Sequence, residues 1–197
     1  MIRIGILGNI GSGKSYVAKN LGYPVFDADH EVATLYKKNK KIFLKLKKIL
    51  PKNIKSFPIE KKEVTEAVLQ KKENLKKIIK IVHVEIRKKM NFFLKENKNK
   101  KFVVLDIPLL LENNLNKKGD VLIFVDSKKS DILKKLKKRK NFNKKLFDIF
   151  KKIQFSSKYK VKKSHFIIKN DFTKKTININ IKAILRKLNN DRNSFRY

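Results

Sequence analysis

The sequence contains no cysteine, which excludes a disulfide framework and any thiolate metal site. No apolar run approaches the roughly 20 residues that a helix needs to cross a bilayer, and no secretory signal peptide precedes the first apolar run. We therefore expect a cytoplasmic protein. At 197 residues the chain is long enough to bury the core of one domain with an inserted subdomain or lid.

Acidic residues and arginine are also scarce. There are 17 Asp and Glu against 52 Lys and Arg, a net charge of +35, and only six of the basic residues are arginine. Arginine is suited to bidentate phosphate and base contacts, whereas here lysines are spread along the chain among many asparagines. This pattern favours a compositional bias over a designed nucleic-acid groove, although the charge would still attract anionic nucleotides.

Strand-like apolar runs alternate with stretches that are typical of helices, and this alternation predicts an α/β fold with a parallel sheet. The runs at 102–105 and 121–125 are continuously apolar, as expected for central strands covered on both faces. In open sheets of this kind ligands bind beyond the carboxyl ends of the strands. The five expected strands are 2–7, 24–27, 101–107, 121–126 and 165–169.

Two helical regions interrupt the expected core. The first, residues 30–100, contains one apolar stripe at helical spacing, formed by Leu75, Ile78, Ile79, Val82, Ile86 and Met90. The second, residues 130–163, is basic and has a break at 140–143, so it suits a lid that closes over a triphosphate. We expect a closing helix at 174–190 and a frayed tail at 191–197.

A complete phosphate-binding loop of the form GxxxxGK[ST] follows the first apolar run. Its glycines let backbone N–H groups turn toward phosphates, Lys14 can reach the β- and γ-phosphate oxygens, and the Ser15 hydroxyl is suited to Mg²⁺. The alternative is an incidental glycine-rich turn, but a strand-like run before the loop and a helix-compatible run after it favour the functional interpretation. The loop comprises Gly8, Asn9, Ile10, Gly11, Ser12, Gly13, Lys14 and Ser15, with Tyr16 next to it.

Carboxylates end two of the expected strands. Asp27 ends the second strand and Asp29 stands two positions later, and we choose Asp29 as the group that accepts the proton of an attacking hydroxyl. The alternative is that Asp29 only caps the following helix. Asp106 ends the third strand, where phosphate-loop enzymes hold Mg²⁺ or its waters, although a strand-end turn also favours aspartate.

Other candidate residues have a structural alternative as well. A histidine beside an apolar stripe, such as His83, is more often packed than reactive, whereas Arg87, one turn further on, can clamp a substrate phosphate. Arg139 could bridge phosphates from the lid, but its spacing also fits a solvated basic face. Pro108, Leu109 and Leu110 directly follow the strand that ends at Asp106 and suit an apolar wall of the acceptor pocket.

The ordered motifs resemble the dephospho-CoA kinase family over nearly the whole chain. IGILGNIGSGKS at 4–15 is similar to the family's GLTGGIGSGKS, and DAD at 27–29 stands where its DAD occurs. HVEIRKKM at 83–90 resembles HPxIRxxM, and LDIPLLLE at 105–112 resembles LDVPLLFE. The spacing of the family's closing segment is kept by Gln154, Ser156, Lys160 and Asn170.

The resemblance implies a P-loop kinase core with a five-stranded parallel sheet, residues 1–29, 101–129 and 164–190 of a single domain spanning 1–197. It implies an acceptor-binding helical insertion at 30–100 and a lid at 130–163. We then expect ATP and Mg²⁺ as cofactors and ATP and dephospho-CoA as partners, without specific nucleic acid or membrane binding, and a monomer.

The implied reaction moves the γ-phosphate of ATP to the ribose 3′-hydroxyl of dephospho-CoA. The implied general base is Asp29, Lys14 and Arg139 stabilise the phosphates, and Ser15 and Asp106 hold Mg²⁺. Asn170 is expected near the adenine. The acceptor-binding residues implied are Asp29, His83, Arg87, Pro108, Leu109 and Leu110.

The sequence departs from the family pattern at several positions. Leu7 replaces a threonine and Asn9 a glycine, so the loop backbone at Asn9 must be attainable by a residue with a side chain. Val84 replaces a proline, and Ser164 and His165 replace an Ala-Asp pair, so any role of that aspartate is lost.

Two other functions remain open at this point. The phosphate loop fixes the donor and not the acceptor, so another kinase of a nucleoside monophosphate or small metabolite is the nearer alternative. A nucleic-acid-binding protein with a regulatory nucleotide site is the more distant one, because no recognised nucleic-acid module or stacking pattern of aromatics is present.

Overall fold

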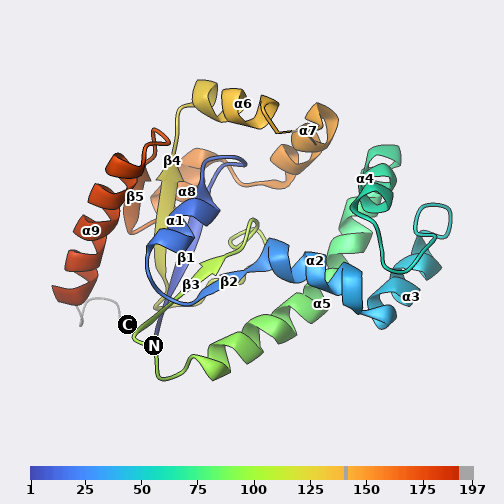
Figure 1. Ribbon diagram of the computed structural model, residues 1–197, viewed down its shortest axis with the longest axis horizontal. Helices are drawn as coiled ribbons and strands as arrows, with labels where there is room; N and C mark the ends of the chain where they lie inside the picture. The colour runs from blue at the N-terminus through green and yellow to red at the C-terminus, as the bar shows by residue number, and fades with distance from the viewer. Residues whose placement is uncertain (140–141, 191–197) are drawn as a thin grey trace. The chain divides into compact units, whose positions relative to one another are not determined.

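The computed structural model describes residues 1–139 and 142–190 (Figure 1). This part of the chain divides into two compact units. The first contains residues 1–27 and the described parts of 96–142 and 151–197, and the second contains residues 28–95 and 143–150. The assignment of 30–100 to acceptor binding and of 130–163 to a lid stays a prediction.

The first unit is built on a five-stranded parallel sheet with the spatial order β2-β3-β1-β4-β5. The interior positions belong to β3, β1 and β4, and nearly all residues of these strands are buried because both faces of an interior strand are covered. The predicted α/β fold class is confirmed. The strands are β1 (Ile2–Gly8), β2 (Val25–Asp27), β3 (Phe102–Asp106), β4 (Val121–Asp126) and β5 (Phe166–Lys169).

Helices cover both faces of this sheet. On one face, α1 (Lys14–Asn20) and α9 (Lys174–Asn190) form a single apolar cluster with alternate residues of the strands, such as Ile4 and Ile123. On the other face α8 (Ser157–Lys163) packs on β1 and β4. The Leu110 side chain fills the space next to Gly5, where a Cβ atom would clash with it. The sheet is therefore buried on both sides.

The register of the parallel strands aligns their carboxyl ends. Gly8 pairs with Val125, and Asp27 pairs with Asp106. Asn170, the residue after β5, donates its backbone N–H to Asp126 O at 2.7 Å. This edge therefore gathers the phosphate loop, two strand-end carboxylates and Asn170, as the sequence predicts.

The second unit is helical. Five of the six predicted stripe residues on α5 are buried and Ile79 is half-buried, so the stripe faces the core of this unit. An ion pair of 2.7 Å joins Lys89 Nζ of α5 to Glu31 Oε2 of α2. Its helices are α2 (Ala28–Lys38), α3 (Lys40–Ile49), α4 (Lys61–Gln70), α5 (Glu73–Glu96) and part of α7 (Lys144–Ile153).

The described part of the region expected to be a lid contains the helices α6 (Lys129–Lys137), α7 and α8. The expected break at 140–143 lies partly outside the described residues, and the expected tail at 191–197 lies wholly outside them. No helix in the described ranges has the length and apolar character needed to cross a membrane.

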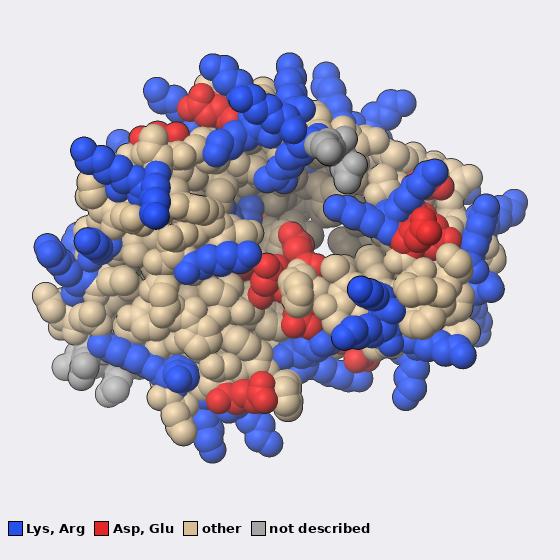
Figure 2. Space-filling view, in the orientation of Figure 1, with Lys and Arg blue, Asp and Glu red and all other residues tan. Residues whose placement is uncertain are grey.

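Basic side chains dominate the visible face of the molecule. Figure 2 shows Lys and Arg projecting from many places, with few Asp and Glu between them. This scattered distribution favours the interpretation of a compositional bias over that of a single groove for a polyanion.

Candidate active site

The phosphate loop connects β1 to α1 through two residues in the left-handed region. Gly13, at the N-terminal cap of α1, has φ 92°, and a Cβ atom there would clash with the Asn170 amide. Gly11 has φ 81°, and a Cβ there would lie 3.1 Å from side-chain atoms of Ile132 and Leu136. Glycine is required at both positions by conformation and by space.

One buried backbone oxygen anchors the loop from two directions. Ser12 O accepts hydrogen bonds from Asn170 Nδ2 at 2.7 Å and from Ser127 Oγ at 3.0 Å. Asn170 Oδ1 in turn accepts the Phe172 N–H at 2.7 Å. The Asn170 amide therefore holds the loop in place, and its expected proximity to adenine stays a prediction.

The two side chains expected to meet phosphate and metal begin α1. Lys14 Nζ donates to the backbone oxygens of Asn9 at 2.9 Å and Gly8 at 3.4 Å, so its charge is held against the loop. Ser15 donates a side-chain hydrogen bond to Asp106. Ile10 is half-buried in the loop and Tyr16 is exposed on α1.

The surroundings of Asp106 disfavour the ionised form of its carboxyl group. Burial raises the pKa of its carboxyl group, while the Ser15 hydrogen bond and the Lys14 charge act in the opposite direction. The neighbouring Asp27 charge raises the pKa further. A cation beside these groups would favour the ionised carboxylate, and a hydroxyl with carboxylate oxygens is a donor set that suits Mg²⁺.

The described residues contain no cluster of three or more His, Cys, Asp or Glu able to hold a metal by themselves. Mg²⁺ commonly keeps several waters and is bound through one or two carboxylates together with substrate phosphates.

The two aspartates at the end of β2 and just after it have different surroundings. Asp27 pairs in register with Asp106. Asp29 is exposed and is the second residue of α2, in the second unit. Asp29 lies in the first turn of this helix, so a stabilising role at the helix start stays open for it beside the role of base. Asp29 as the base stays a prediction.

The candidate acceptor residues of α5 lie one turn apart. His83 is half-buried and Arg87 is exposed. Burial, and secondarily the Arg87 charge, lower the pKa of the His83 imidazole, which favours its neutral form at pH 7. A neutral imidazole can donate or accept a hydrogen bond with the acceptor substrate, but it has no positive charge that would attract a phosphate group.

The first helix of the expected lid is attached to the phosphate loop. Ile132 and Leu136 of α6 pack against Gly11, and Lys135 Nζ lies 4.3 Å from the centre of the Phe172 ring. Arg139 follows this helix and is exposed. Its contact with phosphates remains a prediction.

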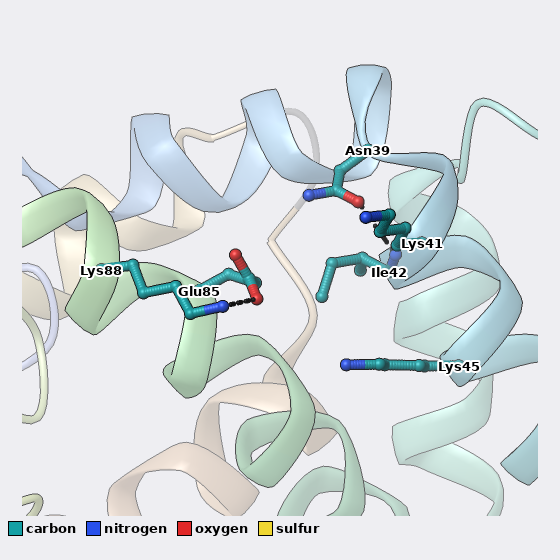
Figure 3. Close-up of a pocket in the computed structure, with 6 residues that line it drawn as sticks. All are labelled: Asn39, Lys41, Ile42, Lys45, Glu85 and Lys88. Atoms are coloured by element: carbon teal, nitrogen blue, oxygen red, sulfur yellow. Dashed lines mark hydrogen bonds and ion pairs between the residues drawn. The ribbon is translucent and has the colours of Figure 1, made fainter.

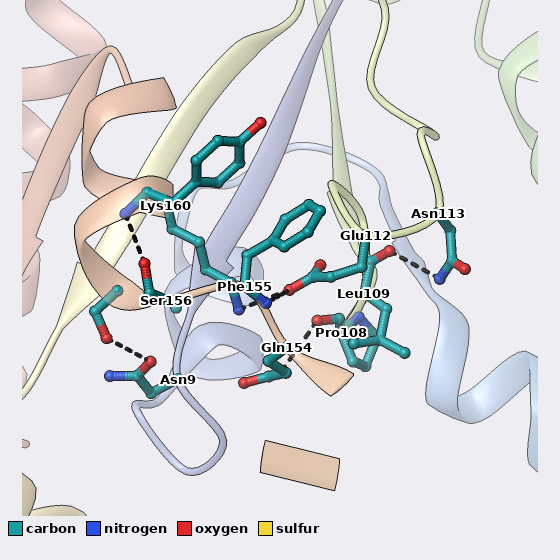
Figure 4. Close-up of polar contacts among 12 residues, drawn as sticks. Asn9, Pro108, Leu109, Glu112, Asn113, Gln154, Phe155, Ser156 and Lys160 are labelled. Carbon is teal, nitrogen blue, oxygen red and sulfur yellow. Dashed lines mark hydrogen bonds and ion pairs between the residues drawn. The ribbon is translucent and has the colours of Figure 1, made fainter. Parts of the chain in front are cut away.

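The 108–112 segment, which follows β3, divides into half-buried and buried positions. Pro108 and Leu109 are half-buried, and the backbone oxygen of Leu109 accepts a hydrogen bond of 2.9 Å from Asn113 Nδ2 (Figure 4). Leu110 is fully buried against Gly5 and Leu122. Its burial argues against the expected direct contact with an acceptor, so only Pro108 and Leu109 remain suited to an apolar wall.

A shallow groove of about 270 Å³ lies between α3 and α5 (Figure 3). Three lysines and one carboxylate line it, and Glu85 Oε1 pairs with Lys88 Nζ at 2.9 Å. The hydrogen bond from Lys88 lowers the pKa of Glu85. Sequence reasoning did not single out this groove, since its residues come from two helices and only Glu85 and Lys88 belong to a quoted motif, at variable positions.

Sequence reasoning also missed several side chains that hold the site. Ser127 follows β4 and could have been found by its place at the carboxyl edge of a strand. Glu112 and Lys160 were noted only as parts of motifs, yet they form a buried ion pair of 3.1 Å. His165 Nδ1 accepts the Leu122 N–H at 2.9 Å, so this unexpected histidine helps to fix the start of β5.

Comparisons with known proteins agree with this geometry. The family model for dephospho-CoA kinase matches residues 2–176. A dephospho-CoA kinase from Wolbachia sp. subsp. Brugia malayi is 33% identical over 190 residues, covering 94% of this chain and 97% of the relative. One from Fusobacterium nucleatum is 34% identical over 178 residues, covering 85% and 89%. The chain belongs to the dephospho-CoA kinase family.

Solved structures support the fold. A crystal structure from Thermus thermophilus has a TM-score of 0.72 at 26% identity and covers 95% of this chain and 97% of its own. A dephospho-CoA kinase from Campylobacter jejuni has a TM-score of 0.61 at 24% identity, with coverages of 94% and 96%.

We expect Asp106→Asn to raise the melting temperature in Mg²⁺-free buffer at pH 7. A raised folded-state pKa means that ionising Asp106 costs stability as the pH rises through that pKa, and a neutral amide removes this cost. Each kcal/mol gained corresponds to about 2–4 °C for a chain of this size. The variant should also lose most of the stabilisation that Mg²⁺ with ADP gives to the wild type.

Calorimetry with and without Mg²⁺ and ADP measures both effects. Asp126→Asn, at the exposed end of β4, is the matched control and should change neither. A lower melting temperature for Asp106→Asn in Mg²⁺-free buffer would contradict the assignment.

His83 should make the folded state less stable at mildly acidic pH. Its pKa is lowered below the ordinary value of 6.5, so its stabilising contribution is complete above pH 6.5 and is lost as the pH falls below it. Urea unfolding at pH 7.5 and 5.5 should show a smaller loss for His83→Gln than for the wild type. His30→Gln, which changes an exposed histidine of α2, should behave like the wild type.

Proposed function

We propose that this chain transfers the γ-phosphate of ATP to the ribose 3′-hydroxyl of dephospho-CoA and so forms CoA in the cytoplasm. The observation that carries the proposal is the match of the family model to residues 2–176, a range that includes the whole phosphate loop and Asp106. The phosphate loop indicates the site for the phosphate donor, and the family indicates that the acceptor is dephospho-CoA.

The reaction needs a nucleophile, a leaving group and a place for one proton. The 3′-hydroxyl oxygen forms a bond to the γ-phosphorus, the bond from that phosphorus to the bridging oxygen breaks, and ADP leaves with the electron pair. The hydroxyl proton passes to the Asp29 carboxylate. Because the transition state is loose, positioning and charge neutralisation do most of the work.

The chain's own groups divide these tasks. Backbone N–H groups of the loop and Lys14 bind the β- and γ-phosphates, and Arg139 stabilises charge during transfer. Ser15 and Asp106 would hold Mg²⁺, which neutralises phosphate charge when it is bound. The acceptor would be positioned by His83, Arg87, Pro108 and Leu109.

The buried state of Asp106 supports a cation at this place. An ionised carboxylate in these surroundings is disfavoured by burial and by the Asp27 charge, and the pKa of Asp106 stays above its ordinary value although the Ser15 hydrogen bond and the Lys14 charge act to lower it. A divalent cation is the partner that reverses this balance.

A coupled assay with ATP, Mg²⁺ and an acceptor panel tests the proposed activity. We expect turnover with dephospho-CoA to exceed that with nucleoside monophosphates and simple sugar alcohols by a factor of about 100 or more in kcat/KM, because buried polar contacts discriminate between acceptors to that extent. Comparable or faster turnover of another acceptor would assign the chain to a different metabolite kinase.

The role of Asp29 predicts a separation between turnover and nucleotide binding. Asp29→Asn should lower kcat by about 10²- to 10⁴-fold, since general-base catalysis contributes that much, while the Kd for ATP changes little. Lys14→Ala should weaken ATP binding as well, and Asp148→Asn, at an exposed position of α7, serves as the control. Unchanged turnover in Asp29→Asn removes the base assignment.

A further inference from the structure

The strongest unexplained feature of the first unit is a charged pair inside it. Lys160 Nζ of α8 lies 3.1 Å from Glu112 Oε1, and the two side chains are 2% and 8% exposed. Burying two charges costs stability, so a hydrophobic pair would often serve a purely structural role as well. The pair joins two parts of the chain that flank the proposed site.

Further contacts make this junction specific. Glu112 Oε1 also accepts the Phe155 N–H at 2.8 Å, and Gln154 Nε2 donates to Pro108 O at 3.4 Å (Figure 4). Both ends of the 108–112 segment are therefore tied to the residues that lead into α8. This segment begins two residues after Asp106 and includes the two half-buried positions suited to the acceptor wall.

The other end of this junction reaches the phosphate loop. Ser157, the first residue of α8, donates through Oγ to Asn9 Oδ1 at 3.0 Å (Figure 4). Asn9 is one of the residues by which this chain departs from the glycine of the family pattern, and it does not have a positive φ. The backbone at Asn9 is therefore not strained. We call the hydrogen bond between the side chains of Asn9 and Ser157 the latch.

We infer that α8 is a brace that couples the phosphate loop to the 108–112 segment, through Asn9–Ser157 at one end and Glu112–Lys160 at the other. Lys160 and Glu112 act as positioning residues: they fix where the acceptor wall stands relative to the bound phosphates. This inference rests on the proposed function, because it assigns the segment to the acceptor side of that reaction.

The test separates positioning from simple stability by comparing single and double variants. Lys160→Met leaves Glu112 as a lone buried charge and should lower both stability and activity. Glu112→Gln with Lys160→Met removes both charges and should recover much of the melting temperature. If the pair positions the segment, the double variant should still show a kcat/KM for dephospho-CoA that is about 10- to 100-fold below wild type.

The brace predicts which kinetic parameter changes. In the double variant the KM for dephospho-CoA should rise, while the KM for ATP stays within about twofold, because Lys14 and the loop anchors are intact. Lys162→Met, an exposed lysine of the same helix, is the matched control and should equal the wild type. Recovery of both stability and acceptor kinetics in the double variant would reduce the pair to a structural role.

A second double-mutant cycle tests the latch, the hydrogen bond between Asn9 and Ser157. Asn9→Gly and Ser157→Ala should each change the KM for ATP by the same factor of about 2 to 10, the net worth of one hydrogen bond. Their combination should be no worse than either single change. Additive effects of the two changes would overturn the latch.

A measurement without turnover keeps this inference apart from the proposed function. Hydrogen exchange of a peptide covering residues 108–115 should become at least tenfold faster in Glu112→Gln with Lys160→Met, and unchanged in Lys162→Met. Unchanged exchange overturns the brace even if the wild type forms CoA. If exchange responds but the wild type forms no CoA, the proposed function fails and the brace remains.

Discussion

The structure of the proposed site depends on one buried backbone oxygen. Ser12 O receives donors from the residues that follow β4 and β5, Ser127 and Asn170, so the phosphate loop is fixed to two strands other than its own. A loop whose N–H groups must point at an anion cannot satisfy its own polar groups internally. The neighbouring strands supply what the loop lacks, and Gly13 leaves the room for it.

At the same edge of the sheet, opposing electrostatic effects act on one carboxylate, an arrangement that suits catalysis. Asp106 is held beside Ser15 and Lys14, yet burial and Asp27 disfavour its ionised form. Groups that are arranged against their own stability are typical of functional sites, because a substrate or metal provides the missing partner. This is the reason for proposing that phosphates and a cation bind at the point where β1 and β3 end.

Sequence reasoning succeeded where a residue's role follows from its place along the chain. The interior strands β3 and β4 were recognised because they are apolar without interruption, and the phosphate loop because its glycines and Lys14 stand at fixed spacing. Sequence reasoning was less informative about Leu110, which it placed in the acceptor wall. A run of leucines looks the same in a sequence whether it faces a pocket or the core. Only the close approach of Gly5 to the Leu110 side chain in the structure shows that this side chain lies in the core.

The sequence by itself determined the fold class, the donor loop and the family, because each depends on periodicity or on motifs of adjacent residues. Only the tertiary structure decided that Glu112 meets Lys160, that Asn170 holds Ser12, and that Asn9 meets Ser157. These partners are 48, 158 and 148 positions apart. Nothing in local propensity encodes such a pairing, since it arises when parallel strands bring distant segments to one edge.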